Sequence, residues 1–336
     1  MSSDDRSDEL AALLALDALG ADEQADAELR LGPFVADLAP VTAAMAEAMS
    51  AAPPDDLRAA TLASAHRRRM PGAPTGRPVA PNRNDALVAT IDDLRALLDD
   101  LSPAESEIVV PGPLGRVHDV VSHLVAVEEL ALGWTGAGPA HDPQTLMDHI
   151  DSTRGRVGEL ADERWTDVVA QWHNTALQAA DACRAAPPDQ AVQAHDLPTT
   201  VEGLVLLRIF ELWAHAIDIA AATGRRRPEL DAARLVLMSQ ALVDALPLGI
   251  ALQGHTAPDT TVRLVLTGPA GGTYDISLSG IIGDDSEPAA TIVTDVTDLC
   301  LVATRRLHPD DLAADIDGDR SVLPLVLSGA AAFARD

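Results

Sequence analysis

Basic and aromatic residues are scarce in this chain of 336 residues. Lys and Arg together number 24, against 52 Asp and Glu, and the formal net charge is −28. Surfaces that bind nucleic acid or an anionic membrane need clustered Lys and Arg, so the charge argues against both partners. Aromatic residues make up 2% of the chain and hydrophobic residues 47%. We therefore expect a large core built mainly from Ala, Leu and Val.

Cysteine is equally rare. Cys183 and Cys300 are far apart and form no C-x-x-C pair, which argues against a thiolate zinc site or a disulfide framework. The first ten residues, MSSDDRSDEL, lack the basic and apolar segments of a secretory signal. No run of about 18 uncharged apolar residues occurs. These absences predict a cytoplasmic protein without a membrane partner.

The length predicts two or three domains, and the overall fold class is expected to be mainly α with a C-terminal α+β domain. The segment boundaries follow Pro, Gly and Arg clusters and changes of hydrophobic period. They predict a small helical module at 8–66, a Pro/Gly/Arg linker at 67–82, a four-helix bundle at 83–224 and a small α+β domain at 225–336.

Helical spacing of apolar residues recurs through the predicted bundle. The expected helices are Asp85–Leu101, Val117–Leu132, a third within 142–185 that is broken near Asp151, and Val201–Thr223. Thr199 or Thr200 can cap the last of these, and Gly224 ends it.

Alternating apolar residues distinguish the C-terminal region. After a helix at Asp231–Leu246, strands are expected at Thr261–Leu266, Thr273–Ser279 and Ala290–Val293, followed by helices at Asp295–Thr304 and Val322–Phe333. The first two strands are joined by Gly268–Gly272, which favours a hairpin.

The helix at Val201–Thr223 (VEGLVLLRIFELWAHAIDIAAAT) is apolar on most sides, yet it carries a polar stripe. Arg208, Glu211, His215 and Asp218 lie within an arc of about 80° at 3.6 residues per turn. A buried polar stripe is costly unless something satisfies it. Glu211 and His215 are one turn apart and can ligate one ion.

A third ligand is available on the second helix. His123 faces the expected core, whereas His118 is about 140° away and is predicted to face out. Two His and one carboxylate form a catalytic zinc set with an open position. Asp119 and Asp218 can accept the remaining imidazole N–H groups. The alternative is a network of Arg208, Glu211 and Asp218 that satisfies itself around a core His without metal.

These residues carry a family resemblance. The segments VHDVVSHL, with His123, and ELWAHAIDI, with Glu211, His215 and Asp218, resemble the mycothiol-dependent maleylpyruvate isomerase family from Asn84 to the C-terminus. The resemblance implies a DinB-like bundle and a sterol-carrier-like α+β domain, with a divalent metal, usually zinc, on His123, Glu211 and His215. The family's Trp-Thr or Trp-Ser before the second helix is Gly115-Arg116 here, so the resemblance does not transfer the substrate.

The family activity implies mycothiol as cosubstrate, a small electrophile as substrate, and isomerisation or S-transfer as the reaction. Asp218 would orient a ligand, Arg208 would pair with a substrate carboxylate or with its neighbours, and Arg305 or Arg306 would approach the site from the C-terminal domain. The same ligand set also accommodates iron, nickel or manganese.

The N-terminal segment suggests a different class of function. Its opening DELAALLALDALG and its later PPDDLR resemble the zinc-free sigma-binding domains of actinobacterial anti-sigma factors. The alternative hypothesis is therefore a cytoplasmic regulator that binds a sigma factor through residues 8–66 and senses a thiol or small ligand in its bundle. A metal-free bundle used only for binding is a third possibility.

Overall fold

The computed structural model describes residues 79–140, 149–195, 197–256, 259–280 and 287–334. The predicted N-terminal module at 8–66 and most of the predicted linker at 67–82 lie outside these residues. The expected sigma-binding role of that module therefore stays a prediction. Residues 66–336 form one compact unit.

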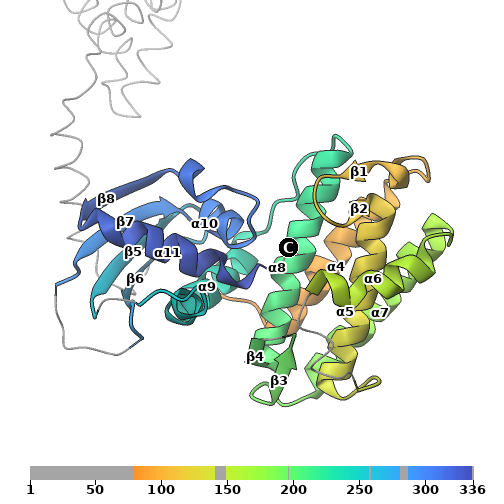
Figure 1. The fold of residues 1–336 in the computed structure, drawn as a ribbon, viewed down its shortest axis with the longest axis horizontal. Coiled ribbons are helices and arrows are strands. Elements are labelled where there is room, and N and C mark those ends of the chain that lie inside the picture. Colours follow the sequence, from red (N-terminus) through yellow and green to blue (C-terminus); the bar gives the residue numbers. More distant parts are fainter. Residues whose placement is uncertain (1–78, 141–148, 196, 257–258, 281–286, 335–336) are drawn as a thin grey trace, which may run out of the picture. The chain divides into compact units, whose positions relative to one another are not determined.

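The first half of this unit is helical (Figure 1). Its helices are α4 (Arg83–Asp99), α5 (Val117–Thr135), α6 (His149–Leu160), α7 (Trp165–Ala185) and α8 (Val201–Ala222). Helix α5 packs against α6 and α7, and α4 packs against α7 and α8. The side chain of Thr200 caps α8 by accepting from the backbone N–H of Gly203, as predicted. Gly224 follows α8 with a φ of 69°, which favours glycine.

The third predicted helix differs from the structure. It divides into α6 and α7 at residues 161–164, and α6 begins at His149, so the break expected near Asp151 was wrong. The turn contains neither Gly nor Pro, and the sequence therefore carries no local signal for it. Its position is fixed by tertiary contacts, because α6 packs on α5 while α7 packs on both α5 and α4.

Two short hairpins were not predicted. Strands β1 (Val109–Val110) and β2 (Gly115–Arg116) precede α5, and strands β3 (Ala191–Ala194) and β4 (Leu197–Thr200) precede α8. Ala194 pairs with Leu197, so His195 lies in a two-residue loop. The loop explains why His195 has a φ of 53°, since such turns need a left-handed residue.

The second half combines helices with one four-stranded sheet. The helices are α9 (Ala232–Leu252), α10 (Val296–Ala303) and α11 (Leu323–Ala330), and the strands are β5 (Thr261–Thr267), β6 (Gly272–Ser277), β7 (Ala290–Asp295) and β8 (Ala314–Gly318). The order is β6-β5-β7-β8, with β5 and β7 parallel and the other neighbours antiparallel. The predicted hairpin is β5–β6. Strand β8 is short and polar, and it was not predicted.

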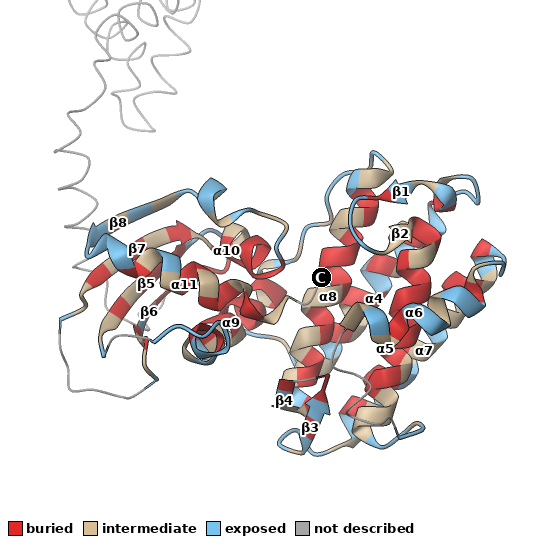
Figure 2. Ribbon diagram, in the orientation of Figure 1, coloured by how far each residue is buried: buried red, intermediate tan, exposed pale blue. Residues whose placement is uncertain are grey.

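Each half of the unit has its own hydrophobic core. One cluster of buried side chains fills the bundle and takes in Met238 of α9 and Leu301 of α10, and a second lies between the sheet and the C-terminal helices. Figure 2 shows α5 and α8 buried along most of their length. Within the described residues, α9 has the length and hydropathy to cross a membrane, but 56% of its apolar window is buried. It packs on α10 and α11, as a core helix does.

Candidate metal centre

The polar stripe of α8 faces the interior, as the helical spacing predicts. Arg208 is 2% exposed and His215 is 4% exposed. The side chain of Glu211 keeps 19% of its surface accessible. Residues at i, i+3 and i+7 share one helix face, so Arg208, Glu211 and His215 present their polar groups in the same direction.

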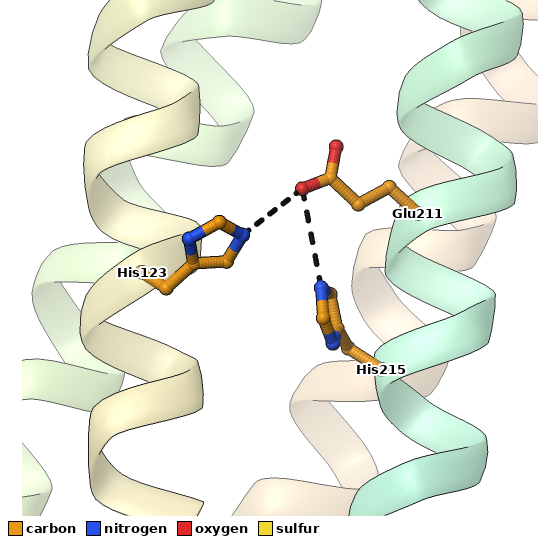
Figure 3. A group of neighbouring side chains, drawn as sticks. All are labelled: His123, Glu211 and His215. Carbon is orange, nitrogen blue, oxygen red and sulfur yellow. Dashed lines mark hydrogen bonds and ion pairs between the residues drawn. The ribbon is translucent and has the colours of Figure 1, made fainter. Parts of the chain in front are cut away.

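Helix α5 brings His123 to this stripe. The ligand atoms of His123, Glu211 and His215 all lie within 4.8 Å of one another, and Figure 3 shows the three side chains pointing toward a common point. Nε2 of His123 is 3.3 Å from Oε1 of Glu211, and Nε2 of His215 is 4.0 Å from the same oxygen. The three predicted ligands therefore converge.

The hydrogen bonding of His123 accommodates the tautomer that a metal ligand needs. The hydroxyl of Thr153 donates to the carbonyl of Ile150 at 2.9 Å, so its oxygen accepts from Nδ1–H of His123 at 2.8 Å. Burial lowers the pKa of His123 to about 3, so the ring is neutral and has one N–H to give. Nε2 therefore presents a lone pair to the carboxylate of Glu211. Two acceptors that face each other repel unless a proton or a metal cation lies between them, and two imidazoles with one carboxylate are a donor set that fits a divalent metal.

The second oxygen of Glu211 is held by Arg208, whose Nη1 donates to Oε2. Arg208 also forms a bidentate pair with Glu128 of α5, which is 2% exposed. Burial raises the pKa of Glu211, but Arg208 and His149 outweigh burial and hold the pKa well below its usual range. The alternative expectation from the sequence was a metal-free network of Arg208, Glu211 and Asp218. The structure contains part of this network, because Arg208 pairs with Glu211, but its second carboxylate partner is Glu128 and not Asp218. The network leaves the lone pair of His123 unsatisfied.

Asp218 lies beside His215, as predicted. Its Oδ2 is 3.5 Å from Nδ1 of His215, which has no other hydrogen-bond partner. Its strongest partner comes from the C-terminal half, where Arg306 donates through Nε at 3.1 Å and Nη2 at 2.5 Å. Burial raises the pKa of Asp218, but His215 and Arg306 outweigh burial and lower it. Arg305, the arginine predicted for the site, is exposed with a φ of 57°, and its neighbour Arg306 reaches Asp218 instead.

Two further histidines were missed by the sequence reasoning. Nε2 of His149, the first residue of α6, lies 3.0 Å from Oε1 of Glu211. Nδ1 of His149 is 2.8 Å from Nε2 of His195 in the β3–β4 loop. Neither residue belongs to a recognisable motif, and the predicted helix through 142–185 gave no reason to place His149 against α8. Their positions depend on the packing of α6 and on the hairpin.

Two expectations for α5 were wrong. His118 was expected to face out, but it is 2% exposed, and its Nε2 is 3.1 Å from the carbonyl of Glu163. The reason is that α5 is covered on nearly all sides, so a helical wheel identifies no solvent face. Asp119 was expected to bond a ligating imidazole. It is held instead by Arg116, through the backbone N–H and the guanidinium, in a capping box at the start of α5.

A cavity of about 440 Å³ opens beside the three converging side chains. Its polar wall includes Glu211, His215 and His149, and the C-terminal half contributes Arg306 and residues of α9 and α11. Neither cysteine lines it. Burial raises the pKa of Cys183 to about 11 and that of Cys300 to about 12, so neither thiol is a nucleophile near neutral pH.

Parts of the chain are similar to known proteins. An uncharacterized protein of Mycobacterium tuberculosis, found in two strains, is 23% identical over 229 residues, which cover 66% of this chain and 83% of that protein. The crystal structure of the mycothiol-dependent maleylpyruvate isomerase has a TM-score of 0.46 to this chain at 15% sequence identity. The structure of its histidine-to-alanine mutant has a TM-score of 0.47 at 13% identity. Each similarity covers 69% of this chain and 91% of the other chain. Residues 87–220 match the family model of the mycothiol maleylpyruvate isomerase N-terminal domain. This part of the chain, which spans most of the helical bundle, is therefore similar to that domain.

Proposed function

We propose that the protein is a cytoplasmic, metal-dependent enzyme that uses a low-molecular-weight thiol, mycothiol or a close relative, to isomerise a small electrophile or to transfer the thiol sulfur to it. The observation that carries the proposal is the lone pair of His123 facing Glu211 and His215 beside an open cavity. The match to the isomerase N-terminal domain supports the thiol as cosubstrate.

His123, Glu211 and His215 would hold the metal, with zinc as the first candidate. A divalent cation at this position lowers the pKa of a thiol bound to it and supplies a thiolate near neutral pH. Thr153 fixes the ring of His123 through Nδ1. Arg208 holds one oxygen of Glu211 and so directs the other toward the imidazoles.

Asp218 has a positioning role in this proposal. It lies against Nδ1 of His215, and Arg306 fixes its carboxylate from the C-terminal half. The cavity beside these side chains leaves room for a ligand next to the candidate metal position.

The proposal is tested by metal analysis together with thiol-dependent turnover of an electrophile panel. The wild-type protein should contain a bound divalent metal and consume electrophile only when thiol is present. His123→Ala should lose the metal and the turnover while its circular dichroism spectrum stays unchanged. Turnover that survives in the metal-free variant would contradict the proposal.

A further inference from the structure

The cavity beside the candidate metal centre is mostly apolar. Its walls combine aliphatic and aromatic side chains from α8, α9 and the end of α5. They include Val127, Trp134, Leu207, Phe210, Leu242 and Phe333. A charged ligand that enters such a space loses hydration and needs a fixed partner of opposite charge to replace it.

The buried guanidinium of Arg208 and the partly buried guanidinium of Arg306 line the cavity, and each is paired with at least one carboxylate. Arg208 directs Nε and Nη2 at Glu128 and Nη1 at Glu211. Arg306 directs Nε and Nη2 at Asp218 and Nη1 at the carbonyl of Thr304. Every guanidinium nitrogen of both residues thus has an acceptor of this chain. A substrate carboxylate would meet guanidiniums whose positive charge is already paired with a bidentate protein carboxylate, so it would gain less from either one than from an unpaired arginine.

The third arginine of the lining is also neutralised. Arg83 pairs with Glu202, and Asp244 adds a second carboxylate that acts on it. Glu202 and Asp244 line the cavity themselves. Each arginine that lines the cavity among the described residues is therefore paired with a carboxylate before any ligand enters.

We propose that the substrate of this cavity is an uncharged, largely apolar electrophile, such as an unsaturated ester, and that carboxylate electrophiles are disfavoured. The inference rests on the proposed thiol-dependent function and specifies its substrate class. In the isomerisation, the thiolate sulfur forms a C–S bond to one alkene carbon while the π electron pair moves toward the neighbouring ester. Rotation about the resulting single bond follows. The electron pair then returns, the C–S bond breaks, and the thiolate leaves the trans alkene without net oxidation.

The first test compares dimethyl maleate with maleate, each with mycothiol at neutral pH. Each enzymatic rate is divided by the uncatalysed thiol rate for the same compound, because the ester is the more reactive electrophile. The acceleration should be at least about tenfold larger for the ester. Equal or greater acceleration of maleate would overturn the inference. If neither compound is accelerated, the result counts against the proposed function. The substrate class is then decided by the binding measurement described next.

The second test measures binding without turnover. Methyl cinnamate and cinnamate differ by one methyl group and one charge, and each is titrated into the purified full-length protein by calorimetry. The ester should bind at least about tenfold more tightly. If cinnamate binds as tightly as its ester, the inference fails whether or not any substrate is turned over.

A pair of variants tests the cause of the preference. Asp218→Asn removes the bidentate partner of Arg306, so the preference for methyl cinnamate should fall several-fold in the binding test. Adding Arg306→Gln to Asp218→Asn removes the released cation and should restore the preference. A ratio unchanged in both variants would contradict the claim that internal pairing of the arginines sets the substrate class.

Discussion

A single ring carries most of the argument for a metal. His123 is fully buried, its Nδ1–H is used by Thr153, and its Nε2 lone pair faces a carboxylate oxygen 3.3 Å away. The sequence predicted the position of this ring, because the helical period of α5 places residue 123 on the side that meets α8. It could not predict Thr153, which is brought in by α6 from 30 residues away.

The lowered pKa of His123 predicts how the metal-free protein responds to pH. The pKa is about 3 in the folded protein, against 6.5 for an unperturbed His. The unfolded chain therefore binds a proton more readily, and the stabilisation from the neutral ring is present above pH 6.5 and lost as the pH falls toward 3.

Urea unfolding of chelator-treated protein at pH 7 and pH 5 measures this effect. The free energy of unfolding should fall between the two values, and it should fall less in His123→Gln, which cannot titrate. An equal loss in both proteins would show that His123 is not responsible.

The buried pair of Glu128 and Arg208 should be important for stability as well as for the site. Both side chains are 2% exposed, so Glu128→Gln leaves a guanidinium without its full charge partner in the core. We expect a loss of about 3 kcal/mol in urea unfolding. The matched control is Glu107→Gln, which breaks an exposed pair with Arg116 and should cost less than about 1 kcal/mol. Similar losses in the two variants would contradict this ranking.

His149 should tune metal affinity without being one of the three ligands. Its Nε2 lies 3.0 Å from the oxygen of Glu211 that faces His123, so it orients that oxygen. His149→Leu should weaken metal binding by about 10-fold to 100-fold in a chelator competition assay. His308→Leu, at an exposed ring, serves as the control and should bind metal as the wild type does. Unchanged affinity in His149→Leu would show that His149 does not position Glu211.

At the scale of elements, long amphipathic helices were predictable and short or tertiary features were not. The helices α4, α5 and α8 and strands β5, β6 and β7 lie close to their predicted ranges. The division of α6 from α7 has no Gly or Pro to mark it, and the two-residue and four-residue hairpin strands are too short for a periodic signal. His195 depends on such a hairpin, which is why its approach to His149 could not be foreseen.

The contact between α9 and α11 provides a prediction for packing. A Cβ added at Gly249 would lie 2.1 Å from the carbonyl oxygen of Gly329, a backbone atom that cannot rotate away. Gly249→Ala should therefore destabilise the protein by about 2 kcal/mol in thermal or urea unfolding.

Gly155 is the control for helix propensity. It is exposed in α6, and an added Cβ would meet nothing within 4 Å. Gly155→Ala should stabilise the protein by about 0.5 kcal/mol or more, because alanine loses less backbone entropy than glycine in a helix. A Gly249→Ala variant as stable as Gly155→Ala would show that the two helices can separate without cost.

At the scale of the whole molecule, the cavity depends on both halves of the unit at 66–336. The bundle supplies the candidate ligands, and the C-terminal half supplies Arg306 and the apolar wall from α9. The family resemblance implied that an arginine of the C-terminal domain would approach the site, and Arg305 was predicted, whereas the structure places Arg306 there. Which arginine reaches the site depends on the turn after α10. Residue 305 has a left-handed backbone conformation in this turn, and the side chain of Arg306 contacts Asp218.

The most direct measurement is the metal content of the purified protein, determined by plasma mass spectrometry together with protein concentration. The account predicts about one divalent ion per wild-type chain and almost none in His123→Ala or His215→Ala. His255→Ala, at an exposed ring that contacts Ser328, should keep the ion. Wild-type protein that stays metal-free after equilibration with zinc and is still fully folded would contradict the central claim.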